Sequence, residues 1–257
     1  MIRERDMRAI QLEMDYETGQ AVLPTIRSVD YDQESIMENI MRLYGIDEIS
    51  LDITYSIGNF YKSRRIPQPK VKMDVCPQTD DTIKIEPLET IPMKDDSCEC
   101  IVYDPPFVIS PKDCPSMTNE IKEGSAVIQK RFASFYPLDE LTETYYFHMK
   151  EFYRMLKNDG FAIVKCQNVI SGGRQVNSPE YLWMIGESLG FDMIDKFVLV
   201  ARQRLISGKV KEQQHSRRYE SYFLVFKKSI SKKPKYLAFQ GGAVANQIMT
   251  SFKQRNL

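Results

Sequence analysis

The chain has 257 residues, and its 35 Lys and Arg residues balance its 35 Asp and Glu residues, so the formal net charge is zero. Apolar residues make up 42% and charged residues 27%, a composition that excludes collagen-like, coiled-coil and wholly disordered chains and allows a sizeable core. No stretch approaches the ~20 consecutive apolar residues of a membrane span, and the charged first residues lack the apolar segment of a signal peptide, so we expect a cytoplasmic protein with no membrane partner.

The chain contains five cysteines and two histidines. An odd number of cysteines without a CxxC pair is not a zinc-binding pattern, and two histidines add few further ligands. We therefore expect no metal site, and reduced, buried thiols at Cys76, Cys98, Cys100, Cys114 and Cys166.

The first clear element is a helix over residues 34–44, where apolar side chains recur at helical spacing and Gly45 can end the helix. We interpret residues 1–45 as an N-terminal extension that carries this helix. Residues 46–228 then form the main domain. Residues 229–257 carry no strong pattern and are interpreted as a C-terminal tail.

Short apolar runs separated by turns follow this helix. The clearest is a buried strand that ends at Asp104, where two prolines stop it. A long stretch of little periodicity comes next, over residues 108–138, and a loop of that length in a compact domain is usually functional or mobile. The predicted strands of this half cover residues 48–53, 71–74, 82–85 and 100–103, with a turn at 56–58.

The second half alternates helices and strands. Helices are predicted over 138–156 and 178–189, and strands over 161–165, 197–201 and 222–226, of which the last two are placed to pair as an antiparallel hairpin. This alternation predicts an α/β fold with a mostly parallel sheet flanked by helices and a terminal antiparallel hairpin. Lys165 ends one of the strands, where it could face a functional site or be solvated. His148 lies inside a helix and is interpreted as structural.

The most informative motif is Asp104-Pro105-Pro106-Phe107 at the end of a strand. A strand followed by Asp-Pro-Pro-aromatic resembles the catalytic motif of the amino-methyltransferases that use S-adenosylmethionine to methylate the exocyclic nitrogen of adenine or cytosine in DNA. The lead-in over 93–103, a small acidic turn and a strand, is similar to that family's. The segment 156–165 resembles the helix end, glycine and fifth strand of S-adenosylmethionine methyltransferases. The resemblance covers residues 46 to about 227 and implies a Rossmann-like class I methyltransferase fold.

The chemistry of such a transfer explains the residue types. An exocyclic amine is a poor nucleophile because its lone pair is delocalised into the ring. The resemblance implies that the Asp104 carboxylate and the Pro105 carbonyl accept the two N–H groups of the amine and localise that lone pair. Pro105 and Pro106 have fixed φ angles and hold the carbonyl rigidly. Phe107 offers a flat face on which the base can stack.

The resemblance also implies a cofactor site that precedes this motif. The segment 52–58 lies where the family has its glycine-rich turn, although Ser56 replaces the first glycine and Ile53 the proline. An acid at the end of the second strand could accept both ribose hydroxyls, and an acid after the third strand could lie near the adenine ring. The residues expected to bind S-adenosylmethionine are Asp52, Tyr55, Ser56, Gly58, Asp74, Glu86 and Asp104, with Asp80 or Asp81 as alternatives to Glu86. Each acid could equally be a surface carboxylate.

Positive charge is concentrated near the C-terminus. Residues 196–235 contain twelve Lys or Arg and two Glu, so this segment carries +10 and the rest of the neutral chain −10. A polyanionic partner such as DNA fits this asymmetry, although a solvated surface would also explain it. Loops 108–138 and 202–218 are predicted to contact phosphates through Lys112, Arg131, Lys209, Lys211, Arg217 and Arg218.

Together these features predict an enzyme that methylates a base amine in DNA after flipping the base out of the helix. Adenine N6 is favoured over cytosine N4, because Asp-Pro-Pro accompanies adenine more often in this family. RNA and protein glutamine are alternative substrates, although the glutamine enzymes usually carry Asn-Pro-Pro. A non-catalytic nucleic-acid-binding subunit with the same fold is a third interpretation, which the intact Asp104 and Phe107 oppose.

Overall fold

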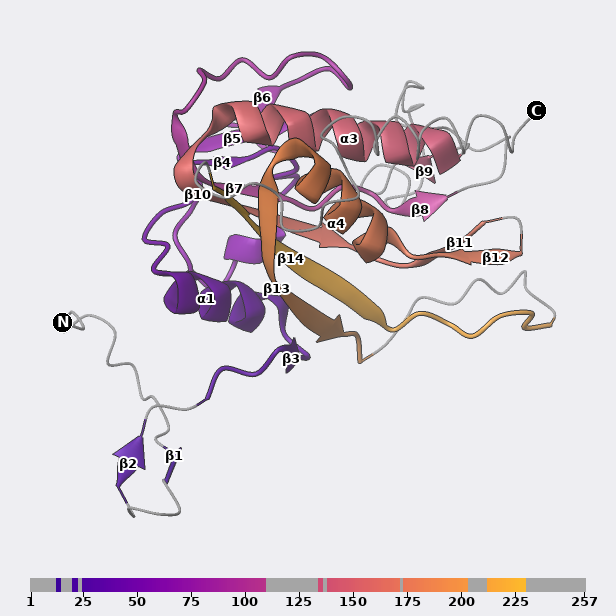
Figure 1. The fold of residues 1–257 in the computed structure, drawn as a ribbon, viewed down its shortest axis with the longest axis horizontal. Coiled ribbons are helices and arrows are strands. Elements are labelled where there is room, and N and C mark those ends of the chain that lie inside the picture. Colours follow the sequence, from indigo (N-terminus) through magenta and orange to yellow (C-terminus); the bar gives the residue numbers. More distant parts are fainter. Residues whose placement is uncertain are drawn as a thin grey trace.

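The structure is a computed structural model of the chain (Figure 1). A small antiparallel pair, β1 (Glu13–Met14) with β2 (Ala21–Val22), precedes the main body. No helix among the described residues is both long and apolar enough to cross a membrane. The structure describes residues 13–14, 20–22, 25–109, 134–135, 138–171, 173–202 and 212–229, with the backbone alone at 13–14, 21–22, 108–109, 134–135 and 138–139.

One eight-stranded sheet organises the protein. The strand β14 runs antiparallel to both of its neighbours, and the other pairs in the sheet are parallel. This arrangement confirms the predicted α/β, Rossmann-like fold with a mostly parallel sheet and a terminal antiparallel hairpin. Across the sheet the strands are β3 (Val29–Asp30), β13 (Phe191–Val200), β14 (Glu220–Lys228), β10 (Leu156–Cys166), β7 (Cys98–Tyr103), β4 (Leu51–Asp52), β5 (Val71–Asp74) and β6 (Ile83–Lys84).

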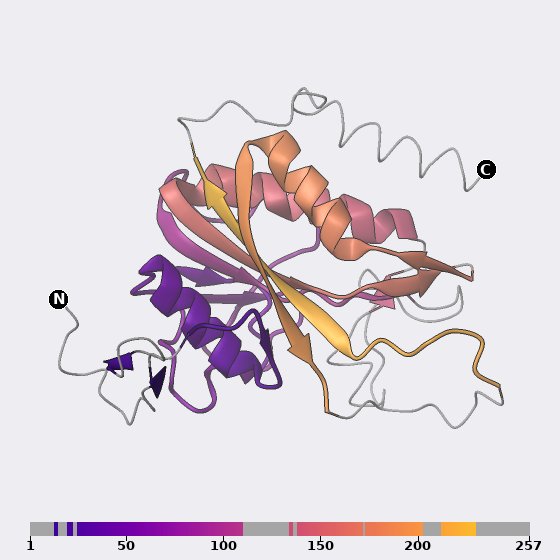
Figure 2. The same cartoon turned by 60° about the horizontal axis from the view of Figure 1, so that its bottom comes forward.

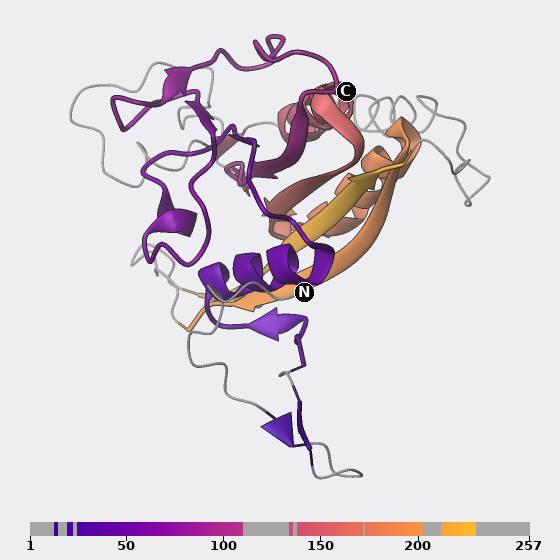
Figure 3. The same ribbon diagram turned by 90° about the vertical axis from the view of Figure 1, so that its left-hand side faces the viewer.

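Helices cover both faces of this sheet. Helix α1 (Gln33–Tyr44) lies on one face, and α3 (Leu138–Met155) and α4 (Ser178–Leu189) lie on the other, as Figures 2 and 3 show. The ends of α1 follow local chemistry: Asp32 caps the first turn by accepting the N–H of Ser35, and Gly45 ends the helix with φ 65°.

Successive side chains of a strand point to opposite faces of the sheet, so the core is divided between the two faces of this sheet. On β7, Ile101 and Tyr103 pack among the side chains of α3 and α4, whereas Cys100 and Val102 pack toward α1. The same alternation on β10 places Ile163 toward α1. The side chains that continue this period past Val102 and Ile163 therefore lie on the α1 face at the carboxyl ends of β7 and β10.

Several predicted bounds differ from the structure. Strand β13 begins at Phe191, six residues earlier than expected, because it pairs with β14 along nearly its whole length. Two short strands that the sequence did not predict, β11 (Val169–Ser171) and β12 (Arg174–Val176), pair antiparallel with each other. Within the predicted loop 108–138, β8 (Val108–Ile109) pairs in parallel with β9 (Ser134–Phe135).

The domain boundaries at 45 and 228 remain predictions. Within the region expected to be an extension, β3 pairs with β13, and α1 contributes Ile36 and Ile40 to the core. The strand β3 is therefore part of the main sheet, and helix α1 packs into the core beside it.

Candidate active site

The carboxyl ends of the parallel strands β4, β5, β7 and β10 meet at one edge of the sheet, which we call the carboxyl edge. Ligands of open α/β sheets bind at this edge, where the strand order reverses. Here the reversal lies between β4 and β7. This edge brings together four parts of the candidate site: the turn after β4 (residues 53–58), Asp74 at the end of β5, Asp104 after β7 and Lys165 near the end of β10. Hydrogen bonds join them in pairs.

The turn after β4 is bonded directly to the Asp-Pro-Pro-Phe motif. The Thr54 hydroxyl accepts the backbone N–H of Asp104 at 2.7 Å, and this hydroxyl lies 3.3 Å from Asp52 Oδ1, to which it donates. The sequence contained no family signal for Thr54, which became identifiable only when the register of β4 and β7 was fixed.

Asp52 lies beneath the turn and is 1% exposed. Its Oδ2 accepts the hydroxyl of Tyr61 at 2.7 Å and its Oδ1 accepts the N–H of Thr54 at 2.8 Å. Burial raises the pKa of Asp52 to about 7, and the negative charges of Asp104 and Asp74 raise it further, against the lowering effect of these two hydrogen bonds. Its contacts suit a residue that supports the turn from below.

The backbone of the turn has the conformation that a glycine would adopt. Ser56 has φ 52° and Gly58 has φ 67°. The N–H of Ser56 donates to Asp74 Oδ2 at 2.8 Å, and the N–H of Cys76 donates to the other oxygen of Asp74 at 2.8 Å. Although serine prefers negative φ, the bond to Asp74 holds Ser56 in the left-handed region. A Cβ on Gly58 would lie 2.5 Å from the hydroxyl oxygen of Tyr55.

Glu86 and Asp81, two candidates for the third acid of the predicted cofactor site, differ in their contacts with the turn after β4. Glu86 and Asp81 are both exposed, and Glu86 pairs with Lys84 at 2.7 Å. Asp81, by contrast, pairs at 2.6 Å with Lys72, whose ammonium lies 4.7 Å from the centre of the Tyr55 ring. The structure thus connects Asp81 to the turn and leaves Glu86 outside the group.

Asp104 makes an ion pair on the carboxyl edge. Its Oδ2 lies 3.0 Å from Lys165 Nζ, and the two side chains are 26% and 13% exposed. The sequence placed Lys165 at a strand end but could not choose between a solvated terminus and the site. Within the motif, Pro105 is buried, and Pro106 and Phe107 are half-buried.

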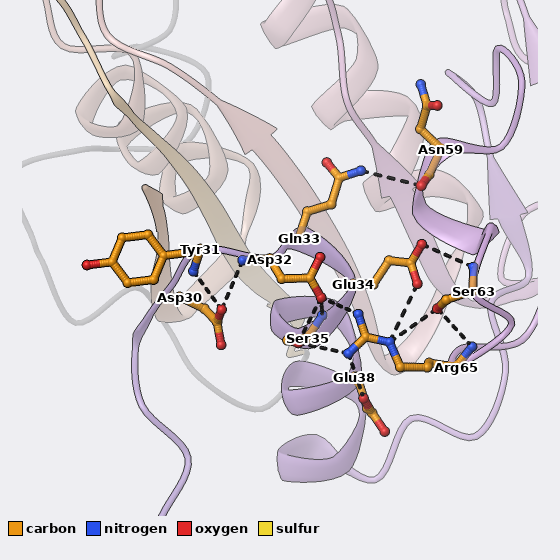
Figure 4. Close-up of polar contacts among 10 residues, drawn as sticks. All are labelled: Asp30, Tyr31, Asp32, Gln33, Glu34, Ser35, Glu38, Asn59, Ser63 and Arg65. Atoms are coloured by element: carbon orange, nitrogen blue, oxygen red, sulfur yellow. Dashed lines mark hydrogen bonds and ion pairs between the residues drawn. The ribbon is translucent and has the colours of Figure 1, made fainter. Parts of the chain in front are cut away.

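Figure 4 shows the polar contacts that fix α1 to the loop after the turn. Arg65 reaches Asp32 and donates to the hydroxyl of Ser35 at 2.8 Å, and Glu34 accepts the N–H of Ser63 at 3.2 Å. These contacts hold the loop that carries the short helix η2 (Asn59–Tyr61) beside the N-terminus of α1.

Two of the predicted phosphate-binding residues can be placed. Arg217 is exposed, and Arg218 donates to the side chain of Gln175 on β12 and to Ser216 at 2.6 Å. Segment 212–219, the β11–β12 hairpin and β8 extend from the same side of the molecule, to the right in Figure 1. The remaining predicted contacts, Lys112, Arg131, Lys209 and Lys211, lie outside the described residues.

His148 is 5% exposed. Its Nδ1 lies 2.9 Å from the carbonyl oxygen of Thr144 and 3.0 Å from the hydroxyl of Tyr103. Burial lowers the pKa of His148 to about 4. No group of three His, Cys, Asp or Glu residues in the described part of the chain is placed to hold a metal ion.

No protein-family model matches the sequence, and no curated protein matches it. Among solved structures, a presumed DNA modification methylase from Thermus thermophilus is 14% identical with TM-score 0.34, and the match covers 56% of this chain and 51% of that one. The cyclase SpnF is 12% identical with TM-score 0.45, covering 77% and 82%. A presumed sarcosine dimethylglycine methyltransferase from Galdieria sulphuraria is 13% identical with TM-score 0.46, covering 76% and 85%.

The chain therefore spans about half the length of the methylase that it matches. Each of the three TM-scores is below 0.5. The strand order of this chain defines its fold, and a fold by itself does not define a function.

Proposed function

We propose that this protein transfers a methyl group from S-adenosylmethionine to the exocyclic amino group of a base in DNA, with adenine N6 favoured over cytosine N4. The observation that carries the proposal is the position of Asp104. It begins the Asp-Pro-Pro-Phe motif, its side chain is partly exposed at the carboxyl edge, and its N–H is bonded to Thr54 in the turn after β4. A carboxylate for the amine and a turn for the cofactor are thus adjacent, as in-line transfer requires.

The residues of the turn fit S-adenosylmethionine. Small side chains at Ser56 and Gly58 let the backbone approach a ligand closely. Asp74 already accepts two backbone N–H groups, but each carboxylate oxygen has room for a second hydrogen bond, so Asp74 can also accept ribose hydroxyls. We assign cofactor binding to this turn with Tyr55 and Asp74, supported from below by Asp52. We prefer Asp81 to Glu86 as the third acid, because only Asp81 is connected to the turn.

The chain's own groups activate the amine. When bound, S-adenosylmethionine supplies a methyl carbon on a sulfonium sulfur. The lone pair of the base nitrogen forms a bond to this carbon while the carbon–sulfur bond breaks, and the electron pair of the broken bond stays with sulfur. The nitrogen loses a proton. The Asp104 carboxylate and the Pro105 carbonyl accept the N–H groups of the amine, which localises its lone pair. The proton passes from the nitrogen to Asp104 or to water. Phe107 stacks on the base and fixes its plane.

DNA is the proposed partner because a basic and aromatic surface borders the carboxyl edge. Tyr31 and Tyr219 are 60% and 41% exposed, and the guanidinium of Arg202 lies 5.6 Å from the centre of the Tyr31 ring. Exposed aromatic rings can stack on bases, and arginines can neutralise phosphates. Together with Arg217 and Arg218, this surface could offset the few kcal/mol that flipping a base costs.

Expression in a bacterium that lacks DNA methyltransferases, followed by single-molecule sequencing of its genome, tests the proposal. The wild-type protein should introduce methylated adenine at a defined sequence. Asp104→Asn keeps the shape of the side chain and the backbone bond to Thr54, but it replaces one acceptor oxygen by a donor. It should lower the turnover about 10²- to 10³-fold while its affinity for S-adenosylmethionine, measured by calorimetry, stays within about tenfold.

The same preparation separates the alternatives. Methyl transfer to purified RNA or to protein, but not to DNA, would replace the substrate in the proposal. Cofactor binding without transfer to any of the three would favour the non-catalytic interpretation. Full methylation by the Asp104→Asn variant would exclude the assigned role of Asp104.

A further inference from the structure

Lys165 occupies an enclosed position beside Asp104. Its ammonium lies 5.1 Å from the centre of the Phe60 ring and 5.6 Å from that of Phe223, so it is flanked by two aromatic side chains. It donates to Asp104 Oδ2 at 3.0 Å and to Gln33 Oε1 at 3.4 Å. A lysine that is 13% exposed has given up most of its hydration, and these contacts replace that hydration.

The register of the sheet produces this pair. Tyr103 on β7 lies opposite Val164 on β10, so the next residues of the two parallel strands, Asp104 and Lys165, are also neighbours. Both continue the side-chain period that faces α1. Gln33, the first residue of α1, completes the arrangement: its Nε2 donates to the carbonyl of Asn59 at 3.4 Å, as Figure 4 shows, while its Oε1 accepts Lys165.

We propose that Lys165 is a positioning residue that fixes the orientation of the Asp104 carboxylate for the amine. The inference rests on the proposed function and adds a residue to the same site. With Oδ2 held by Lys165, the plane of the carboxylate is set and Oδ1 remains as the acceptor for one N–H of the substrate. The Pro105 carbonyl accepts the other. Gln33 and the two rings restrict Lys165 in turn, so α1 contributes to the alignment of the site.

The chain provides a matched control in Lys228. Its ammonium lies 2.7 Å from Asp96 Oδ1 and 2.7 Å from the carbonyl oxygen of Leu156, and 4.9 Å from the centre of the Tyr153 ring. It is a buried cation with a carboxylate and an aromatic partner, like Lys165. Because Leu156 begins β10, this pair lies at the opposite edge of the sheet. Its removal should affect stability without affecting the site.

The experiment compares wild type, Lys165→Met, Lys165→Arg and Lys228→Met. Tritium transfer from labelled S-adenosylmethionine to DNA from a methyltransferase-deficient bacterium gives kcat, calorimetry gives the affinity for S-adenosylmethionine, and thermal unfolding gives stability. We expect Lys165→Met to lower kcat about 10- to 100-fold, with the affinity within about twofold and Lys228→Met at the wild-type kcat. Lys165→Arg should recover part of the loss because it keeps a donor beside Asp104.

Two results would overturn the positioning role: a wild-type kcat in Lys165→Met, or equal losses of kcat in Lys165→Met and Lys228→Met. If Lys165→Met does not fold, Lys165→Gln takes its place in the same comparison with Lys228→Met, because glutamine also removes the positive charge beside Asp104. If the wild type methylates no DNA, the proposed function fails and crystal structures decide the role of Lys165. An Asp104 side chain that changes rotamer in the variant supports the role, and an unchanged rotamer refutes it.

Discussion

The hydroxyl of Thr54 links the two halves of the candidate site, because it accepts the backbone N–H of Asp104 at 2.7 Å. The turn expected to hold the cofactor and the motif expected to activate the amine therefore cannot shift independently. The proposed transfer from a bound methyl donor to a base would depend on their relative placement, which this hydrogen bond helps to constrain.

Thr54→Val should separate this hydrogen bond from the packing of Thr54. Valine has nearly the same shape but no acceptor, so the N–H of Asp104 loses its partner. We expect unfolding to become easier by about 1–3 kcal/mol and kcat to fall. Thr54→Ser keeps the hydroxyl and should retain most of the free energy of unfolding, measured by urea unfolding, and most of kcat, measured by methyl transfer. Equal behaviour of the two variants would show that the hydroxyl is unimportant.

The pKa of Asp52 predicts a dependence of stability on pH. Burial raises the pKa of Asp52 from 3.8 to about 7 in the folded protein, so between these values the folded state holds a proton that the unfolded chain has released. Asp52 therefore lowers the free energy of unfolding as the pH rises from about 4 to 7, by up to about 1.4 kcal/mol per pH unit. Asp52→Asn should remove this fall in urea titrations at several pH values. An unchanged slope would contradict the shifted pKa.

His148 should act in the opposite direction. Burial lowers the pKa of His148 from 6.5 to about 4, so between these values the unfolded chain binds the additional proton. The free energy of unfolding therefore gains a contribution as the pH rises from about 4 to 6.5. His148→Phe should abolish that gain and leave the fall caused by Asp52 visible. If the unfolding free energy of His148→Phe has the same pH dependence as that of the wild type, His148 is not buried in its neutral form.

Gly58 and Gly45 form a matched pair of glycines with positive φ. A Cβ at Gly45 would meet nothing within 4 Å, whereas at Gly58 it would lie 2.5 Å from the Tyr55 hydroxyl. Gly45→Ala should cost about 1–2 kcal/mol from backbone strain alone, and Gly58→Ala about 1–3 kcal/mol more. Gly58→Ala should also weaken binding of S-adenosylmethionine in calorimetry. Equal costs and unchanged binding would show that the turn is not a ligand site.

The double variant Arg217→Glu, Arg218→Glu tests the DNA surface. It should weaken binding to all DNA sequences alike. The slope of the logarithm of the binding constant against the logarithm of the salt concentration should become shallower by about one unit for each phosphate that the variant no longer neutralises. Lys94→Glu, an exposed residue before β7 at the opposite edge, serves as the control and should leave both quantities close to the wild-type values. Fluorescence anisotropy at several salt concentrations measures them. Unchanged affinity and slope in the double variant would indicate that this segment is only a solvated surface.

The sequence by itself determined the features that depend on neighbouring residues. The period of the apolar residues and Gly45 specified α1, the buried run before Asp104 specified β7, and the alternation of helices with strands specified the α/β class. Such signals are local, because a turn, a helix end or a strand face is set within a few residues. The Asp-Pro-Pro-Phe motif likewise became recognisable from four consecutive residues.

The tertiary structure alone decided which of these features meet. Asp104 and Lys165 are 61 positions apart in the sequence, and only the register of β7 against β10 pairs them. Ser56 has positive φ although its residue type disfavours it, because Asp74 on the adjacent strand β5 holds its N–H. Asp81 rather than Glu86 connects to the turn through Lys72. Contacts between distant segments depend on how the strands pack side by side, and this packing is encoded in the whole core and not in any one motif.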